Sequence, residues 1–165
     1  MNITGKAIVY GNNIDTDRII AGKYTKTLNL QHLADHVFED LDPDFLTKLK
    51  DRNIVVAGSN FGCGSSREQA PLALKKAGVS VVIARSFARI FYRNAINIGL
   101  PIIEIPDHTI SDFDELVIYL GKGIVKNVNT NCSYKGSKMP QVMMDIINDG
   151  GLVSYLKKRG TYVTS

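Results

Sequence analysis

The chain has 165 residues, of which 44% are hydrophobic and 22% are charged. This length and balance predict one globular domain with an ordinary core, and they exclude a disordered chain. The net charge is +4, and because the basic residues form no long run, we expect a solvated surface and no nucleic-acid partner. No apolar run approaches the ~18 residues that a membrane span needs. The first residues carry no secretory signal, so we expect a cytoplasmic protein.

The first third of the chain predicts a strand, a long loop and two helical segments. Residues 6–10 predict a first strand, and residues 14–27 show no clear hydrophobic period, so we expect a loop there. Residues 32–40 predict a helix because apolar residues recur at helical spacing. Residues 45–50 predict a short helical piece that follows Pro43.

Strands and helices alternate through the middle of the chain. Apolar runs at residues 53–57, 80–84 and 101–105 predict buried strands, and the two helices between them are expected to end at Gly78 and Gly99. Because this alternation is typical of strand–helix–strand units, we expect a mostly parallel sheet with helices packed on it.

The last third has a different pattern. Residues 116–120 and 124–128 flank a glycine turn and predict an antiparallel hairpin, and residues 142–148 and 152–158 predict two closing helices. With no repeat and no linker, residues 1–165 are expected to form a single α/β domain with an antiparallel β appendage.

A glycine-rich segment after the strand at residues 53–57 gives the strongest functional signal. Its glycines let a ligand approach the backbone, the helix start that follows favours an anion, and Arg67 can grip a carboxylate or phosphate with two hydrogen bonds. The alternative is local capping, because Ser66 with Gln69 matches a capping box, although Pro71 indicates that the regular helix begins later. The phosphate-loop and dinucleotide motifs do not fit, since the required lysine and third glycine are missing.

Two long motifs point to a known family. They are Gly62–Glu68, which is Gly-Cys-Gly-Ser-Ser-Arg-Glu, and Ser86–Leu100, which begins Ser-Phe-Ala-Arg-Ile-Phe-Tyr-Arg-Asn. Together they resemble the aconitase superfamily, specifically the small subunits of isopropylmalate isomerase and homoaconitase and the swivelling domain of aconitase. Asn12–Ile20 is similar to that family's first loop and Gly150–Leu156 to its C-terminal helix, so the resemblance covers nearly the whole chain.

The resemblance implies a three-layer β/β/α swivelling domain that serves as one subunit of a hydro-lyase. Such an enzyme removes water from a small 2-hydroxy dicarboxylate and adds it back at the neighbouring carbon, using a [4Fe–4S] cluster. The cluster needs three protein thiolates, and this chain has only Cys63 and Cys132. We therefore expect a large subunit to carry the cluster, no metal on this chain and no activity without the partner. When isolated, the chain is compatible with a homo-oligomer.

By match to the family, Ser65 is the catalytic base, acting as an alkoxide that removes the proton from the carbon beside a carboxylate. A serine hydroxyl can do this only where nearby N–H groups and cations stabilise the anion. Arg67 is expected to hold a substrate carboxylate, and Ser66 to donate a hydrogen bond. The residues expected to support the active site are Asp17, Gly62 and Gly64, with a simple turn as the alternative role for Asp17.

The stretch Gly22–Thr27 matches the part of the family that meets the variable arm of the substrate, and Thr25 and Lys26 are expected to contact that arm. Homoaconitase-like members place Arg at the position of Lys26, and isopropylmalate isomerases place an apolar residue there. Lysine can bind a carboxylate or lay its stem along an alkyl group. Overall likeness favours 2- and 3-isopropylmalate, in leucine biosynthesis. Three alternatives to this activity remain: that of a homoaconitase, that of a 2,3-dimethylmalate dehydratase, and a reaction on a citrate-like substrate.

Several other residues are assigned no catalytic role. The three histidines are expected to lie on the surface, although His32 and His36 are spaced to clip a metal. Ser86 is expected to cap a helix on which Arg89 and Arg93 lie four apart, where they form ion pairs within the chain or meet the large subunit. Two other functions compete with the hydro-lyase, namely a non-catalytic anion- or nucleotide-binding module and an RNA-binding protein.

Overall fold

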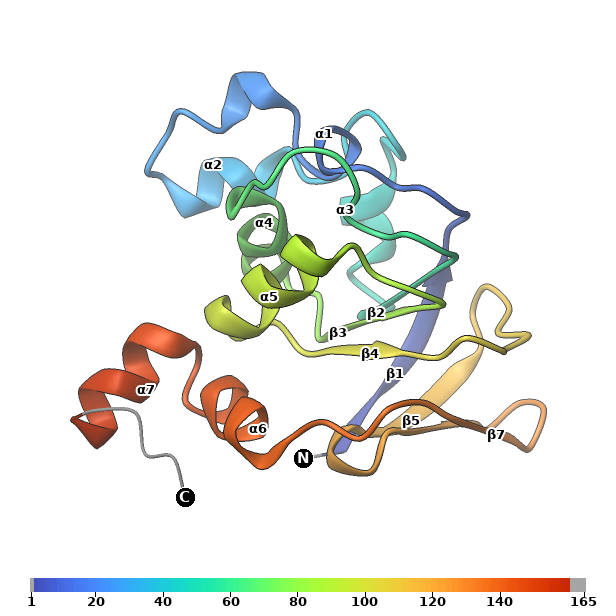
Figure 1. Ribbon diagram of the computed structural model, residues 1–165. Coiled ribbons are helices and arrows are strands. Elements are labelled where there is room, and N and C mark those ends of the chain that lie inside the picture. The colour runs from blue at the N-terminus through green and yellow to red at the C-terminus, as the bar shows by residue number, and fades with distance from the viewer. Residues whose placement is uncertain (1, 161–165) are drawn as a thin grey trace.

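The computed structural model describes residues 2–160, which form a seven-stranded mixed sheet with helices packed against it (Figure 1). The strand order is β4-β3-β2-β1-β5-β6-β7. Strands β1 to β4 run parallel, and β1, β5, β6 and β7 pair antiparallel. The strands are Asn2–Val9 (β1), Ile54–Ala57 (β2), Val81–Ala84 (β3), Ile102–Glu104 (β4), Glu115–Tyr119 (β5), Ile124–Asn127 (β6) and Cys132–Lys135 (β7).

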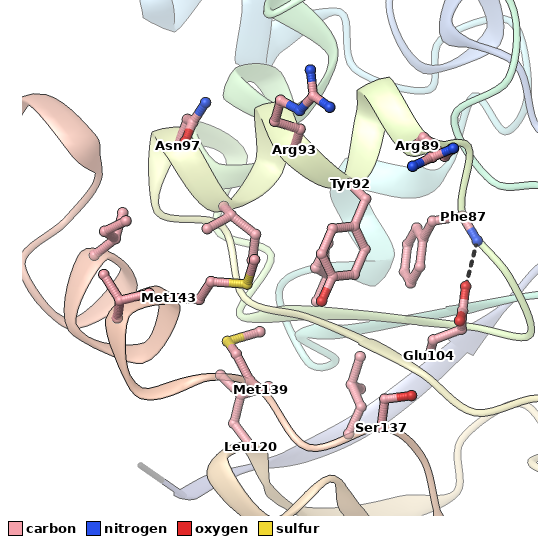
Figure 2. Close-up of a pocket in the computed structure, with 15 residues that line it drawn as sticks. Phe87, Arg89, Tyr92, Arg93, Asn97, Glu104, Leu120, Ser137, Met139 and Met143 are labelled. Carbon is pink, nitrogen blue, oxygen red and sulfur yellow. Dashed lines mark hydrogen bonds between the residues drawn. The ribbon is translucent and has the colours of Figure 1, made fainter. Parts of the chain in front are cut away.

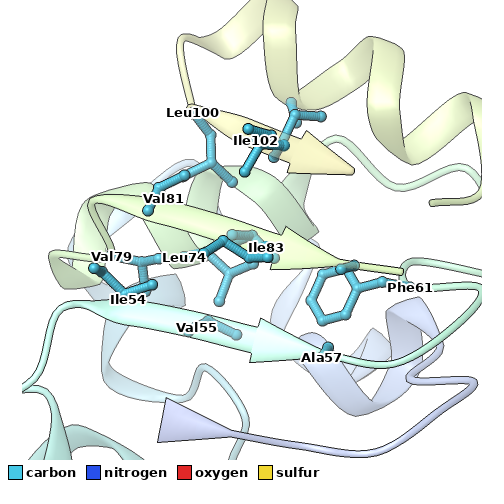
Figure 3. Close-up of a cluster of buried hydrophobic side chains, with 14 of the residues drawn as sticks. Ile54, Val55, Ala57, Phe61, Leu74, Val79, Val81, Ile83, Leu100 and Ile102 are labelled. Carbon is cyan, nitrogen blue, oxygen red and sulfur yellow. The ribbon is translucent and has the colours of Figure 1, made fainter. Parts of the chain in front are cut away.

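The parallel half contains the main core. Every residue of β2 and β3 is buried, as expected for strands that are covered on both faces. Figure 3 shows Leu74, Val79 and Phe61 packed among the side chains of these strands. The helices and 3-10 turns are Thr16–Ile19 (α1), Gly22–Tyr24 (η1), Leu30–Asp35 (α2), Phe45–Lys48 (α3), Gln69–Ala77 (α4), Arg89–Ile98 (α5), Leu120–Lys122 (η2), Gln141–Asn148 (α6) and Leu152–Arg159 (α7).

Strand β1 joins the two halves of the sheet. Its residues 7–9 pair in parallel with β2, and its residues 2–6 pair antiparallel with β5. The prediction of a strand only at residues 6–10 was therefore too short, because the N-terminal half of β1 is polar and gains its structure from pairing with β5.

The sheet curls so that its two edges approach each other. A Cβ atom on Gly136, just after β7, would lie 2.0 Å from the carbonyl oxygen of Glu104 in β4. The Thr109 N–H, in the segment that follows β4, donates to the Tyr134 hydroxyl at 3.3 Å. Strand β7 was not predicted, because its mostly exposed Cys-Ser-Tyr-Lys sequence lacks an apolar pattern.

The region predicted as one loop, residues 14–27, contains α1 and η1. The Asp15 carboxylate caps α1 by accepting the Arg18 N–H at 2.8 Å. The helix predicted at residues 32–40 is α2, which begins two residues earlier and ends at Asp35. The chain then turns so that Phe38, at φ +58°, is fully buried, and this tertiary contact outweighs the helical pattern.

The other predicted elements agree closely with the structure. Helices α4 and α5 end at Gly78 and Gly99, both in left-handed conformations, and α6 and α7 occupy the two predicted C-terminal segments. In Figure 1, α4 and α5 lie on the same side of the parallel strands. Within residues 2–160, none of the helices has the length and apolar character that crossing a membrane requires.

Candidate functional site

The glycine-rich loop between β2 and α4 is held on both sides by backbone hydrogen bonds. The Gly62 N–H donates to the Ile14 carbonyl at 2.8 Å, and the Thr16 N–H donates to the Cys63 carbonyl at 2.9 Å. On the other side, the Phe61 N–H donates to the Ser86 carbonyl at 3.0 Å. Three loops distant in sequence thus form one rigid platform, which we define as residues 12–16, 58–67 and 86–88.

Two glycines in this platform are required by its geometry. Gly62 has φ +83°, and a Cβ atom there would lie 2.2 Å from the Phe91 ring. Gly64 has φ +96°, a conformation that side chains rarely adopt. Both positions were predicted to support the site, and their left-handed backbone conformations form the turn that Ser65 follows.

Ser65 is exposed, and a buried threonine holds it. The Thr16 hydroxyl donates to the Ser65 carbonyl at 2.9 Å, and its oxygen lies 3.4 Å from Ser65 Oγ. Thr16 is 2% exposed, so the exposed Ser65 rests on a buried side chain. The sequence analysis missed Thr16, and the only signal was its place between two aspartates in the Asp-Thr-Asp run.

Arg67 lies beside Ser65 and is held in position by the first loop. Its Nη1 forms an ion pair with Asp17 and donates to the Ile20 carbonyl at 3.3 Å. Gly22 lies against the same guanidinium, since a Cβ there would be 3.2 Å from Nη2. Within residues 2–160, Nε and Nη2 have no hydrogen-bond partner, which leaves one edge of the guanidinium for an anion.

The predicted capping box is wrong. Helix α4 begins at Gln69 and its N-terminus has no side-chain cap, so Ser65 to Arg67 precede the helix. Pro71 is its third residue, where a missing N–H costs no helical bond. The Gln69 amide instead donates to the Thr25 carbonyl at 3.4 Å, which ties the start of α4 to the predicted substrate-arm loop.

The predicted cap at Ser86 is also wrong. Helix α5 begins at Arg89, and Ser86 lies before it in the platform. Its hydroxyl accepts the Asn60 N–H at 2.7 Å, so it fixes the glycine-rich loop rather than the helix.

The substrate-arm loop, residues 22–29, is anchored through Tyr24. The Tyr24 ring stacks on His36, with centroids 3.9 Å apart, and its hydroxyl donates to Glu39 at 2.6 Å. His36 Nδ1 lies 3.2 Å from the other oxygen of the same carboxylate. Hydrogen bonds from Tyr24 and then His36 lower the pKa of Glu39, and the bond to Glu39 raises the pKa of Tyr24. This cluster was not predicted.

The tip of this loop projects into solvent. The Thr25 hydroxyl is used locally, donating to the Gly22 carbonyl at 2.8 Å. Lys26 is exposed and forms no ion pair with any described residue, and the neighbouring Leu28 is 98% exposed. The structure thus brings Ser65, Arg67 and Asp17 together and leaves Lys26 on an adjacent loop that is tied to them through Gln69 and Thr25.

The histidines and cysteines do not form a metal centre. His108 is 8% exposed, so the prediction that all three histidines lie on the surface was wrong for this one. Within residues 2–160, no group of three His, Cys, Asp or Glu side chains could hold a metal, and both cysteines are free thiols. These residues do not fit the [4Fe–4S] cluster that the resemblance implies.

The fold and this site define a known class of protein. A family model described as the aconitase C-terminal domain matches residues 6–108, which is more than half of the chain. The chain therefore belongs to the aconitase C-terminal domain family.

Relatives that match over nearly their whole length show to which group within this family the chain belongs. The 3-isopropylmalate dehydratase small subunit of Clostridium botulinum is 49% identical, over 96% of this chain and 100% of that protein. The isopropylmalate/citramalate isomerase small subunit of Methanocaldococcus jannaschii is 51% identical over 95% of each chain. Within its family, the chain is thus one of the 3-isopropylmalate dehydratase small subunits.

A solved structure supports the same grouping. The crystal structure of 3-isopropylmalate dehydratase from Methanocaldococcus jannaschii aligns with a TM-score of 0.90 and 46% identity, over 97% of this chain and 96% of that chain. The expected swivelling-domain fold is confirmed, with a curled seven-stranded mixed sheet.

Proposed function

We propose that this chain is the small subunit of a cytoplasmic hydro-lyase that interconverts 2-isopropylmalate and 3-isopropylmalate. The observation that supports this most is the exposed Ser65 hydroxyl beside a positioned Arg67, in a chain of this family. The reaction would remove water from one isomer and add it back with the hydroxyl on the neighbouring carbon.

Ser65 would supply the proton-transfer step. As an alkoxide, it would take the proton from the carbon next to a carboxylate and return a proton during rehydration. A free serine hydroxyl is a weak base, so the site must stabilise the anion. The Thr16 hydroxyl can turn from the Ser65 carbonyl to Ser65 Oγ, 3.4 Å away, and the Arg67 cation lies on the same loop.

Arg67 would bind a substrate carboxylate through its free edge, and Ser66 would donate to the substrate. Because Asp17 and the Ile20 carbonyl already hold Nη1, the guanidinium would be oriented before substrate arrives. Thr25 and Lys26 would meet the variable arm once the tip of the loop closes over the site.

The other half of the site would come from a large subunit. The described residues cannot hold the iron–sulfur cluster, so we propose that the large subunit carries it and that its surface covers Ser65. An open, water-exposed Ser65 also explains why the isolated chain should be inactive, since water weakens the electrostatic stabilisation that an alkoxide base needs.

The test is Ser65→Ala in the reconstituted pair of subunits. Loss of the proton acceptor should lower kcat by at least about a hundredfold, while the variant still binds the large subunit and melts like the wild type. Ser59→Ala removes another exposed hydroxyl of the same loop, one that forms no hydrogen bond with a described residue, and serves as the control. Near-normal turnover by Ser65→Ala would contradict the assignment of Ser65 as the catalytic base.

Citramalate is a second candidate substrate. One close relative is named for both isopropylmalate and citramalate, and the exposed Lys26 here is polar rather than apolar. A panel of isopropylmalate, citramalate, homocitrate, citrate and 2,3-dimethylmalate on the reconstituted pair would rank the substrates by kcat/KM.

Tight nucleotide or RNA binding by the isolated chain would instead favour the competing functions, an anion- or nucleotide-binding module or an RNA-binding protein.

A further inference from the structure

A groove lies between α5 and α6, and it extends beyond the loops of the platform. It encloses about 490 Å³ and is bordered by α5, β4, α6 and the segment before α6. Figure 2 shows Tyr92 and Phe87 pointing toward Met139 and Ser137 across this space. Its volume is in the range of pockets that accept a large side chain or a small molecule.

Apolar side chains line the groove and continue onto the surface. Met139 and Met143 line the groove from α6 and the segment before it, and methionine adapts its shape readily to an inserted group. Val142, which lines the groove, is 38% exposed. An apolar pocket with an exposed apolar residue in its lining is typical of the central part of a protein interface.

Two arginines border the groove along α5. Arg89 and Arg93 lie one helical turn apart, and both are exposed. Neither guanidinium has an ion pair or hydrogen bond with another residue in 2–160, so the ion-pair role that the sequence left open for them is not seen. The nearby Glu104 carboxylate accepts the Phe87 N–H at 3.0 Å. Two unpaired like charges four residues apart repel each other until a carboxylate reaches them.

The groove is continuous with the catalytic platform. Phe87 lines the groove, and its ring packs edge-on against Phe61 of the platform, with centroids 5.9 Å apart. The two residues also form a backbone bridge, and α5 begins immediately after it. A protein that covers Ser65 could therefore reach the groove along one continuous surface.

We propose that this groove is a docking site for the large subunit, which inserts an apolar side chain between α5 and α6 and places carboxylates against Arg89 and Arg93. This inference rests on the proposed function, because it names where that partner binds. Burial of the apolar side chain would supply affinity, and the charge pairs would fix orientation and accelerate association.

Binding of the cluster-loaded large subunit to the full-length chain tests the proposal. Arg93→Glu reverses a groove charge, and Val142→Asp puts a carboxylate at the apolar border. Each should weaken the Kd by at least about tenfold, with kcat unchanged at saturating large subunit. Lys157→Glu and Val153→Asp make the same changes on the exposed face of α7 and should alter the Kd less than about twofold. Melting temperatures of all four variants confirm that they fold.

The outcomes separate this inference from the proposed function. Wild-type affinity for the large subunit in both groove variants would overturn the docking site. The same conclusion would follow if the groove instead mediated self-association of the chain or bound a small amphipathic carboxylate. A complex that forms through the groove but has no isopropylmalate turnover would leave the docking site standing and refute the proposed substrate. Absence of any binding by the wild type would overturn both.

Discussion

The platform and the substrate-arm loop border the same site but are held in different ways. The platform is joined by backbone hydrogen bonds on two sides, and Gly62 and Gly64 adopt conformations that few other residues allow. The arm loop is anchored by the side chains of Tyr24 and Gln69, and its tip at Lys26 and Leu28 is exposed. Backbone bonds persist through most sequence changes, whereas side-chain anchors are lost with one substitution.

This difference matches the two tasks that the site must perform. Proton transfer requires an oxygen fixed within a fraction of an ångström, and the platform provides that precision. Recognition of a variable arm requires a segment whose side chains can change without disturbing the base, and a loop held mainly at one end permits it. We therefore expect platform substitutions to alter stability and kcat, and arm-loop substitutions to alter KM and substrate choice.

The largest expected effect is from Gly62→Ala. The new Cβ would clash with Phe91 while the backbone keeps φ +83°, so we expect a loss of about 3–5 kcal/mol in unfolding free energy. Gly78→Ala is the matched control, because it has φ +111° and open space and should cost only about 1–2 kcal/mol. Chemical denaturation measures both, and equal losses would mean that contact with Phe91 does not constrain the loop.

Thr16→Val tests the support of Ser65. Valine keeps the shape but cannot donate to Ser65, and we expect kcat to fall about tenfold with little change in KM, corresponding to ~1.4 kcal/mol. The Ser65 carbonyl also accepts the Arg67 N–H at 3.0 Å, so it is not left without a partner and the fold should survive. Thr16→Ser should restore most of the rate in steady-state assays, and a Thr16→Val enzyme with normal kcat would show that Thr16 has only a structural role.

Tyr24→Phe tests the anchor of the arm loop. It removes the hydrogen bond to Glu39 and keeps the stack on His36, so we expect KM to rise about threefold to tenfold with kcat nearly unchanged. Tyr119→Phe, on β5, is the control. A fall in kcat without a change in KM would contradict the division of tasks between the two regions.

The smallest expected effect is a pH dependence of stability from His108, which lies beside Ala57 and Arg85. Burial, and then the charge of Arg85, lower the pKa of His108, and an interaction with the Ala57 carbonyl opposes them. The folded protein therefore favours neutral His108, so its contribution to stability is full above the usual pKa of about 6.5 and is lost as the pH falls from that value through the lowered pKa of the folded state. Denaturation of wild type and His108→Asn at pH 7.5 and pH 5 should show a smaller pH effect in the variant.

The sequence was sufficient to predict the elements with strong apolar runs. The strands β2 and β3 and the helix ends at Gly78 and Gly99 were located to within a residue or two, because burial on both faces and the left-handed glycine conformation leave clear patterns. Ser65 and Arg67 were singled out by a motif, and their catalytic roles remain proposals. Their partner Thr16 was missed, because a hydroxyl 49 residues away leaves no local pattern.

The sequence by itself therefore determined the alternation of strands and helices, the glycine-rich turn and a thiol count too small for a cluster. Only the tertiary structure decided that Ser66 and Ser86 do not cap helices, that Phe38 leaves its predicted helix and that the polar N-terminal half of β1 is a strand. The physical reason is that these outcomes depend on pairing and burial between distant segments, such as β1 with β5, whose free energy exceeds any local preference.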